Sequence, residues 1–365
     1  MDREEVYRVT LRRFLEPVAD YLDDPSVSEI MINGIDEVYI ERGGQVEKTE
    51  ASFQDEDFLL AAARNIAQYT SKRITRHTAN FNSRLPDGSR VHVVMPKCSR
   101  KGLCISIRRF PAHNFTLEGL TRRGSITQEA KEYIELIVGL EKNIIVSGGT
   151  GSGKTSLLNA ISREISSVRR IIVIEDSSEL QLQQPHVLSF ETAPADKHGQ
   201  GAVSIRELFH SALRMRPDRI VIGECRGGEA LDLIQAMTSG HGGSMSTLHA
   251  NTPFDALNRL ETMALMSGME IPLKALRSQI ASAIDVVIQL ARLDNGVRKI
   301  TEISEITNLD NEGRYQLIPI FKLATTNDAA TNLVWSGIRS SFSEAITGSA
   351  FYAKINLTKK LFANA

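Results

Sequence analysis

The feature that most constrains the fold of this chain is a glycine-rich loop set between an apolar strand and a helix. The stretch reads NIIVSGGTGSGKTSLLNAI and contains the spacing Gly148-x-x-x-x-Gly153-Lys154-Thr155. Glycines let the backbone curl until its N–H groups face inward, and the following helix adds the positive end of its dipole. By average composition the bare pattern arises by accident in on the order of one chain in a hundred of this length. The loop therefore predicts a phosphate-binding site.

The residues of this loop have expected roles toward ATP and Mg²⁺. The Lys154 ammonium is expected to bridge the β- and γ-phosphates, and the Thr155 hydroxyl is expected to ligate Mg²⁺. The predicted nucleotide-binding residues are Gly148, Gly149, Thr150, Gly151, Ser152, Gly153, Lys154, Thr155 and Ser156.

Hydrolysis of a bound nucleotide also needs carboxylates that orient water and complete the metal shell. Two candidates follow apolar strands: Glu175 in RRIIVIEDSSEL and Glu224 in RPDRIVIGECRGGEA. In doubly wound sheets, ligand-contacting residues lie at the carboxyl ends of the strands. Either residue alone is readily explained as a hydrophilic strand end, but the pair downstream of a phosphate loop favours hydrolysis over a module that only binds ATP. The residues alone do not separate the two roles.

A glycine- and serine-rich stretch, SGHGGSMSTLHAN, contains a histidine directly after an expected strand over 244–248. His249 is a candidate to sense the γ-phosphate by donating a hydrogen bond. A lone histidine is more often structural, so this role depends on its context.

Two arginines of the first part of the chain are candidates for a charge that reaches the γ-phosphate from outside the loop. The stretches GSRVH and SIRRF place Arg90 and Arg108 on or beside strands. A guanidinium can bind two phosphate oxygens at once. The alternative is that they form a solvated or interface salt-bridge face with Arg109.

Length and composition predict a two-domain chain in a reducing compartment. Its 365 residues, 42% of them hydrophobic, can bury more than one core, and the net charge of −1 gives no reason to expect direct nucleic-acid binding. Cys98, Cys104 and Cys225 contain no C-x-x-C pair, which argues against disulfides and a four-cysteine zinc site. The sequence shows no signal core and no apolar run of about 18 residues, so we expect a cytoplasmic chain without a transmembrane segment.

Periodicity and turn residues suggest the domain boundaries. Residues 1–110 are predicted to form an α+β domain that begins with a helix over 4–22 and continues with short strands and a further helix. Residues 111–127 contain a proline, two glycines and no periodicity, and are predicted as a linker. Residues 128–365 alternate apolar strands with helices, which predicts an α/β domain with a mostly parallel sheet. The alanine-, serine- and threonine-rich tail from about Phe321 predicts nothing further.

Taken together, these motifs resemble those of a known family. GGTGSGKT, IEDSSEL, RPDRIVIGECRGGEA and STLHANTPFDALNRLE are similar to the Walker A, Asp-box, Walker B and His-box motifs of the type II/type IV secretion ATPase superfamily. The resemblance extends from about Leu22 to Val297. Within the superfamily, SIRRF, GHGGSMSTLHAN, ETMALM and RSQIASAIDVVIQLARL are most similar to CpaF-type (tight adherence, Tad) pilus ATPases.

The resemblance implies a fold, an assembly and residue roles. It implies a RecA-like P-loop ATPase domain preceded by a smaller, PAS-like α+β domain, assembled as a homo-hexamer. Lys154 and Thr155 would act on phosphate and Mg²⁺, Glu175 would activate water, Glu224 would lie on the metal side and His249 would sense the γ-phosphate.

The implied function is coupling of ATP hydrolysis to assembly, and possibly retraction, of a type IV or Tad pilus. The partner would be an inner-membrane platform protein, which would hold the ATPase at the membrane periphery. The alternative is a type IV secretion or conjugation ATPase. The four-cysteine insertion of many pilus-extension and type II secretion ATPases is absent, which disfavours those branches. The sequence also begins almost at the expected N-terminal domain, without the long helical extension associated with many CpaF-type proteins, so the choice of branch stays open.

Overall fold

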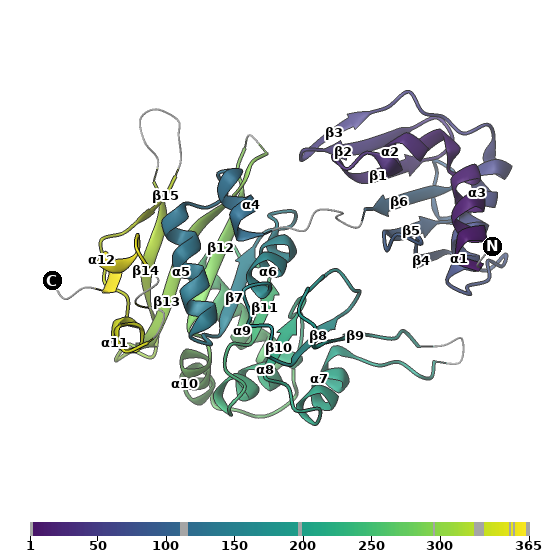
Figure 1. The fold of residues 1–365 in the computed structure, drawn as a ribbon. Coiled ribbons are helices and arrows are strands. Elements are labelled where there is room, and N and C mark those ends of the chain that lie inside the picture. Colours follow the sequence, from purple (N-terminus) through teal and green to yellow (C-terminus); the bar gives the residue numbers. More distant parts are fainter. Residues whose placement is uncertain are drawn as a thin grey trace. The chain divides into compact units, whose positions relative to one another are not determined.

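A computed structural model describes residues 3–109, 116–195, 199–294, 296–324, 332–349, 352 and 355–362. The chain divides into two compact units, residues 1–114 and 115–365, and each is described by itself (Figure 1). Among the described residues, no helix combines the length and apolar character needed to cross a membrane.

The first unit begins with a broken helix. Instead of one helix over 4–22, the chain forms α1 (Arg3–Phe14), the 3₁₀ turn η1 (Glu16–Val18) and α2 (Ala19–Asp23). Pro17 lies in the first turn of η1, and its missing N–H and fixed φ prevent a continuous helix through this point. The expectation of a single helix was therefore wrong.

A six-stranded antiparallel sheet forms the body of the first unit. Its order is β3-β2-β1-β6-β5-β4. Ile30, Ile32, Ile105 and Ile107 are buried on one face, and they share a core with Leu59 of α3 (Glu56–Tyr69). The strands are β1 (Val27–Asn33), β2 (Val38–Arg42), β3 (Gln45–Lys48), β4 (Asn80–Arg84), β5 (Arg90–Val94) and β6 (Cys104–Arg108).

The second unit contains a nine-stranded mixed sheet in the order β15-β14-β13-β12-β7-β11-β10-β8-β9. The run from β12 to β9 is parallel, whereas β13, β14 and β15 add antiparallel pairs. The mostly parallel sheet expected from the sequence thus continues into an antiparallel extension. The strands are β7 (Ile144–Gly148), β8 (Ile171–Glu175), β9 (Val187–Glu191), β10 (Arg219–Ile222), β11 (Met245–Leu248), β12 (Val286–Arg292), β13 (Arg298–Leu309), β14 (Tyr315–Ala324) and β15 (Asn332–Trp335).

Helices cover both faces of this sheet because consecutive strand residues are apolar. In β8, Ile171 and Val173 belong to one buried cluster, while Ile172 and Ile174 belong to the other. The first cluster includes α4 (Leu117–Arg122), α5 (Gln128–Gly139) and α6 (Lys154–Ser162). The second includes α7 (Ile205–Leu213), α8 (Glu229–Thr238), α9 (Pro253–Leu265) and α10 (Leu273–Ala283).

The segment predicted as a linker is partly structured. Residues 110–115 lie outside the described residues, but α4 follows directly and is N-capped by Thr116, whose hydroxyl accepts the Gly119 N–H at 3.0 Å. Leu117 is buried in the second unit's core. Residues 117–122 are therefore not a linker. The six-residue helix is too short to show periodicity, and its capping threonine was the signal overlooked.

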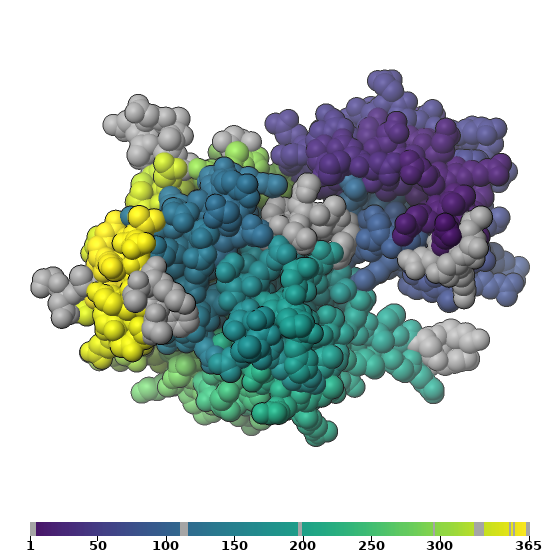
Figure 2. Space-filling view, viewed as in Figure 1, coloured from purple at the N-terminus to yellow at the C-terminus, as the bar shows by residue number. Residues whose placement is uncertain are grey.

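The C-terminal segment packs onto the second unit, although its sequence pattern predicted no structure. The buried Glu305 carboxylate accepts hydrogen bonds from Tyr133 Oη at 2.6 Å, Ser340 Oγ at 2.5 Å and the Ser341 N–H at 2.7 Å. Glu132 of α5 accepts the Thr358 N–H at 3.0 Å, and Figure 2 shows the C-terminal atoms (yellow) beside those of the α4–α5 region (blue). The segment includes α11 (Ser343–Thr347) and α12 (Lys359–Phe362).

Candidate functional site

The phosphate loop joins β7 to α6, and its backbone requires glycine. Gly151 and Gly153 have φ angles of 70° and 96°, in the left-handed region that favours glycine. A Cβ atom on Gly148 would lie 2.5 Å from Ser152 Oγ and 2.8 Å from the Leu290 carbonyl oxygen. The strand–loop–helix arrangement is therefore the one that the sequence spacing predicted.

The side chain of Lys154, the first residue of α6, folds back over the loop. Its Nζ donates to the Gly149 carbonyl oxygen at 3.0 Å, and Ser152 Oγ donates to the same oxygen at 2.8 Å. Only 8% of Lys154 is exposed. The other predicted loop residues with side chains are Thr150, which is exposed, and Thr155 and Ser156, which are half-buried in the first turn of α6.

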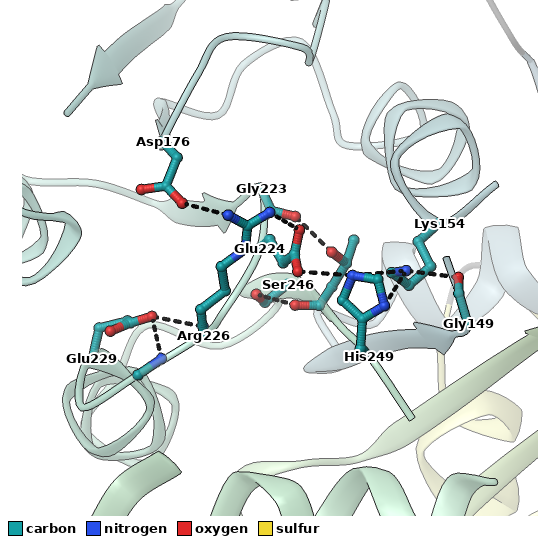
Figure 3. Close-up of polar contacts among 11 residues, drawn as sticks. Gly149, Lys154, Asp176, Gly223, Glu224, Arg226, Glu229, Ser246 and His249 are labelled. Carbon is teal, nitrogen blue, oxygen red and sulfur yellow. Dashed lines mark hydrogen bonds and ion pairs between the residues drawn. The ribbon is translucent and has the colours of Figure 1, made fainter. Parts of the chain in front are cut away.

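A chain of polar contacts runs from Lys154 to the ends of β10 and β8 (Figure 3). Lys154 Nζ lies 3.3 Å from His249 Nδ1, and His249 Nε2 lies 3.0 Å from the Glu224 carboxylate. Arg226 contacts Glu224 at 2.7 Å and Asp176 at 3.3 Å. The sheet order makes this possible, because β11 lies between β7 and β10 and brings His249 between the phosphate loop and Glu224.

Neighbouring charges and burial determine the protonation states of Glu224 and His249. Burial raises the pKa of Glu224, but the hydrogen bond and charge of Arg226, together with the charges of His249 and Lys154, outweigh it and lower the pKa. Burial and the charge of Lys154 lower the pKa of His249, although Glu224 opposes them. At neutral pH, Glu224 is ionised and His249 is neutral. Because a carboxylate only accepts, His249 Nε2 carries the proton and Nδ1 accepts from Lys154.

Glu175 ends β8, beside the strand that leads to Glu224. It is 3% exposed, and its Oε1 accepts the Glu179 N–H at 2.9 Å and the Leu180 N–H at 3.1 Å. A Cβ atom on Gly223 would lie 2.8 Å from Glu175 Cγ, so the two strand ends are in close contact. The structure thus brings Glu175 next to the residue that precedes Glu224.

Arg90 and Arg108 belong to the first unit. Arg84, Arg90 and Arg108 are directly opposite one another across β4, β5 and β6, and the row continues with Glu29 of β1 and Glu41 of β2. Residues paired in this way share one face of a sheet, and like charges directly opposite are destabilising.

Sequence reasoning assigned no role to four charged residues of the second unit's site. Arg226 and Asp176 extend the polar chain, while Arg292 and Arg298 lie beside the phosphate loop, with Arg298 Nε donating to the Gly151 carbonyl oxygen at 2.8 Å. Arg226 and Asp176 each adjoin a strand end already singled out. The Asn-Gly dipeptide at 295–296 is a hairpin signal that would have placed the two other arginines together.

The sequence matches a family model described as "Type II/IV secretion system protein" over residues 13–333. The chain belongs to the type II/IV secretion system protein family. This confirms the superfamily expected from the motifs. The match spans both compact units and the whole of the site described above.

Two curated relatives illustrate the range of the type II/IV secretion family. A "putative conjugal transfer protein" of Mycobacterium tuberculosis H37Rv is 32% identical over 84% of this chain and 87% of its own length. The type IV secretion system protein VirB11 of Brucella suis is 33% identical over 80% of this chain and 88% of its own. The crystal structure of the pilus retraction motor PilT with bound ADP covers 89% of this chain and 82% of its own, at a TM-score of 0.56 and 18% identity. That likeness shows a shared fold.

Proposed function

We propose that this family member is a Mg²⁺-dependent ATP hydrolase that drives a membrane-associated transport or assembly machine. The observation that carries the proposal is the contact between the phosphate-loop lysine and the His249–Glu224 pair. Nucleotide binding alone does not require an ionised carboxylate beside the phosphate loop, whereas hydrolysis needs one to hold the metal ion or orient water. The second unit is then a RecA-like ATPase domain, and the first a PAS-like domain that works with it.

The residues present fit a magnesium ion held with a nucleotide. Mg²⁺ takes oxygen ligands and usually binds through one or two protein groups while phosphates and water complete its shell. Thr155 in the first turn of α6 and the ionised Glu224 are the two groups we assign to it. When bound, the ion would neutralise charge on the phosphates.

The remaining polar groups divide the work of hydrolysis. Lys154 would neutralise the β- and γ-phosphates. His249, neutral and held by Glu224, would report on the γ-phosphate by exchanging its contact with Lys154. We assign Glu175 to orienting the attacking water, because backbone N–H groups fix its carboxylate at the strand end.

Arg90 and Arg108 would supply positive charge from the first unit to the γ-phosphate. Their support is that they lie directly opposite each other on β5 and β6, so that two guanidinium groups share one face of the sheet. ATP would then act as a clamp between the units, and hydrolysis would release the first unit.

We further propose a homo-hexamer that docks on an inner-membrane platform protein from the cytoplasm, without direct contact to nucleic acid. A Tad-type pilus is the assembly product that the CpaF-like motifs favour. The second candidate is secretion or conjugation, and the relatives named for VirB11 and conjugal transfer, at 33% and 32% identity, favour it.

Two experiments test this function. Phosphate release by the purified full chain, with ATP and with or without Mg²⁺, should show turnover that depends on the metal. No turnover by oligomeric protein would refute the enzyme. Replacing the chromosomal gene with Lys154→Ala separates the branches, since loss of surface pili supports the pilus machine and loss of substrate transfer with normal pili supports secretion.

A further inference from the structure

The hairpin formed by β12 and β13 extends over the phosphate loop. β12 pairs with β7 up to Leu290 opposite Gly148 and continues two residues beyond it. The hairpin is closed by the Leu293 N–H, which donates to the Val297 carbonyl oxygen at 2.8 Å. The residues just outside this closure are Arg292 and Arg298, which lie directly opposite each other.

Both arginines approach the loop from the hairpin side. Arg298 Nε donates to the Gly151 carbonyl oxygen at 2.8 Å, and a Cβ atom on Gly153 would lie 3.5 Å from Arg298 Cδ. A Cβ atom on Gly151 would lie 4.0 Å from an Arg292 guanidinium nitrogen. These contacts lie within the second unit, so they do not depend on the placement of the first.

The hydrogen bond from Arg298 fixes the orientation of one loop peptide. In a trans peptide the C=O and the following N–H point in opposite directions. Arg298 holds the Gly151 C=O, so the Ser152 N–H is turned to the opposite side, where Gly149 O and Lys154 Nζ lie. That is the side of the loop that the predicted phosphates would occupy.

Two arginines directly opposite each other repel, which costs stability in a hairpin. The pair lies beside a loop predicted to bind a highly charged anion, to which both guanidinium groups would be attracted. Arg298 and Arg292 thus combine a backbone hydrogen bond with local positive charge.

We propose that this hairpin is a clamp on the phosphate loop. Arg298 is a positioning residue that holds the 151–152 peptide for phosphate binding, and Arg292 adds positive charge at the same loop. The inference rests on the proposed nucleotide site. It adds Arg298 and Arg292 to that site, which otherwise consists of the phosphate loop, the two carboxylates and the histidine.

Side-chain geometry provides a sharp test. Glutamine Nε2 is separated from Cα by the same number of bonds as arginine Nε, so Arg298→Gln keeps a donor where the Gly151 contact needs one and loses the charge. Arg298→Lys keeps the charge but has a methylene at that position. Arg298→Ala removes both. Arg314→Ala is the matched control, because Arg314 lies near the β13–β14 turn and pairs with Asp310.

The measurement is the affinity of the purified full chain for ATP and ADP, by titration with a fluorescent nucleotide and competition. We expect Arg298→Ala to weaken both by about tenfold, Arg298→Lys by nearly as much, and Arg298→Gln by less than about threefold. Arg292→Ala should weaken ATP binding about threefold at low salt and less at high salt. Arg314→Ala should match the unaltered protein.

Three outcomes would overturn the clamp. The first is an unchanged nucleotide affinity in Arg298→Ala. The second is that Arg298→Gln binds nucleotide as weakly as Arg298→Ala while Arg298→Lys binds it normally. The third is an unchanged ATP affinity in Arg292→Ala at low salt. Failure of the proposed nucleotide site would give a different result. The unaltered protein would then not bind ATP, or it would bind ATP equally well with and without the Lys154→Ala substitution.

Discussion

Two carboxylates at the same edge of the nine-stranded sheet are held in opposite ways. Glu175 is buried, and backbone N–H groups of its own loop bind it at 2.9 and 3.1 Å. Glu224 is half-buried and is bound by the side chains of His249 and Arg226 at 3.0 and 2.7 Å. Backbone donors are fixed by the fold, whereas long side chains can change rotamer.

The difference separates a fixed group from one that can switch. The orientation of Glu175 is determined once β8 and its loop have formed. Glu224 can exchange its partners when a nucleotide changes the contacts of Lys154, since the two residues are linked through His249. The proposed function uses both kinds of group, because one would position the reaction and the other would respond to the nucleotide.

The largest expected effect comes from removing the cation of the phosphate loop, Lys154. Lys154→Ala should lower ATP turnover by at least about 100-fold, because the phosphate charge of the transition state is left without the loop's cation. Steady-state phosphate release measures this, with Lys360→Ala as the control, since Lys360 pairs with Glu129 on α5. A variant that retains more than about a tenth of normal turnover would contradict the role.

Glutamine substitutions test the comparison directly. Glu175→Gln and Glu224→Gln should each keep ATP binding and lower turnover by about 100-fold, because both keep shape and remove charge. Their thermal stabilities should differ. Glu175→Gln places an amide against fixed backbone donors and should lower the melting temperature by several degrees. Glu224→Gln should lower it by less, because its partners are side chains that can change rotamer.

Calorimetry and nucleotide titration of the two glutamine variants distinguish these outcomes. If either variant fails to bind ATP, its assigned role is wrong. Equal melting temperatures would show that the two carboxylates do not differ as a fixed and a switchable group.

The arginine row of the first unit should have a smaller effect. Arg90→Ala and Arg108→Ala are each expected to reduce turnover by about tenfold in oligomeric protein, because each removes one charge-assisted contact to the γ-phosphate. ATPase rate and ATP affinity are the measurements. Normal turnover in both variants would leave the clamp between the units without a mechanism. Arg42→Ala is the control, since Arg42 lies on β2 and pairs with Asp24.

The sequence predicted those parts of the site that are local in the chain. Lys154 follows its glycines directly, and Glu175 and Glu224 end apolar strands, so spacing and strand pattern were sufficient to place them. The three residues are brought near one another by the strand order β7-β11-β10-β8. The motif resemblance predicted the fold class, but the antiparallel β13–β15 extension, with polar residues within its strands, was not recognised.

Contacts between distant residues could not be read from the sequence. Arg298 and Gly151 are separated by 147 positions, and Arg226 and Asp176 by 50. Such pairs depend on strand order and on side-chain direction, which single-sequence patterns do not encode. The helix predicted over 4–22 failed for a local reason, since the interruption at Pro17 outweighed an otherwise regular apolar spacing.

The smallest expected effect is a shift in pH dependence, and it tests how Arg226 controls Glu224. The hydrogen bond and charge of Arg226 help to lower the pKa of Glu224 against the opposing effect of burial. A carboxylate whose pKa is lowered by folding stabilises the folded protein at pH values above its ordinary pKa. This stabilisation is lost as the pH falls through the folded-state pKa. Turnover that needs ionised Glu224 should fall in the same direction. Arg226→Ala raises the pKa, so the acid limb of the pH–turnover profile should move to higher pH, while turnover near pH 8 changes by less than about threefold. Arg226→Lys should restore part of the shift, and Arg277→Ala, which breaks a pair with Glu261, should cause none. An acid limb that stays in place in Arg226→Ala would show that other groups keep Glu224 ionised. Arg226 would then not control the protonation of Glu224.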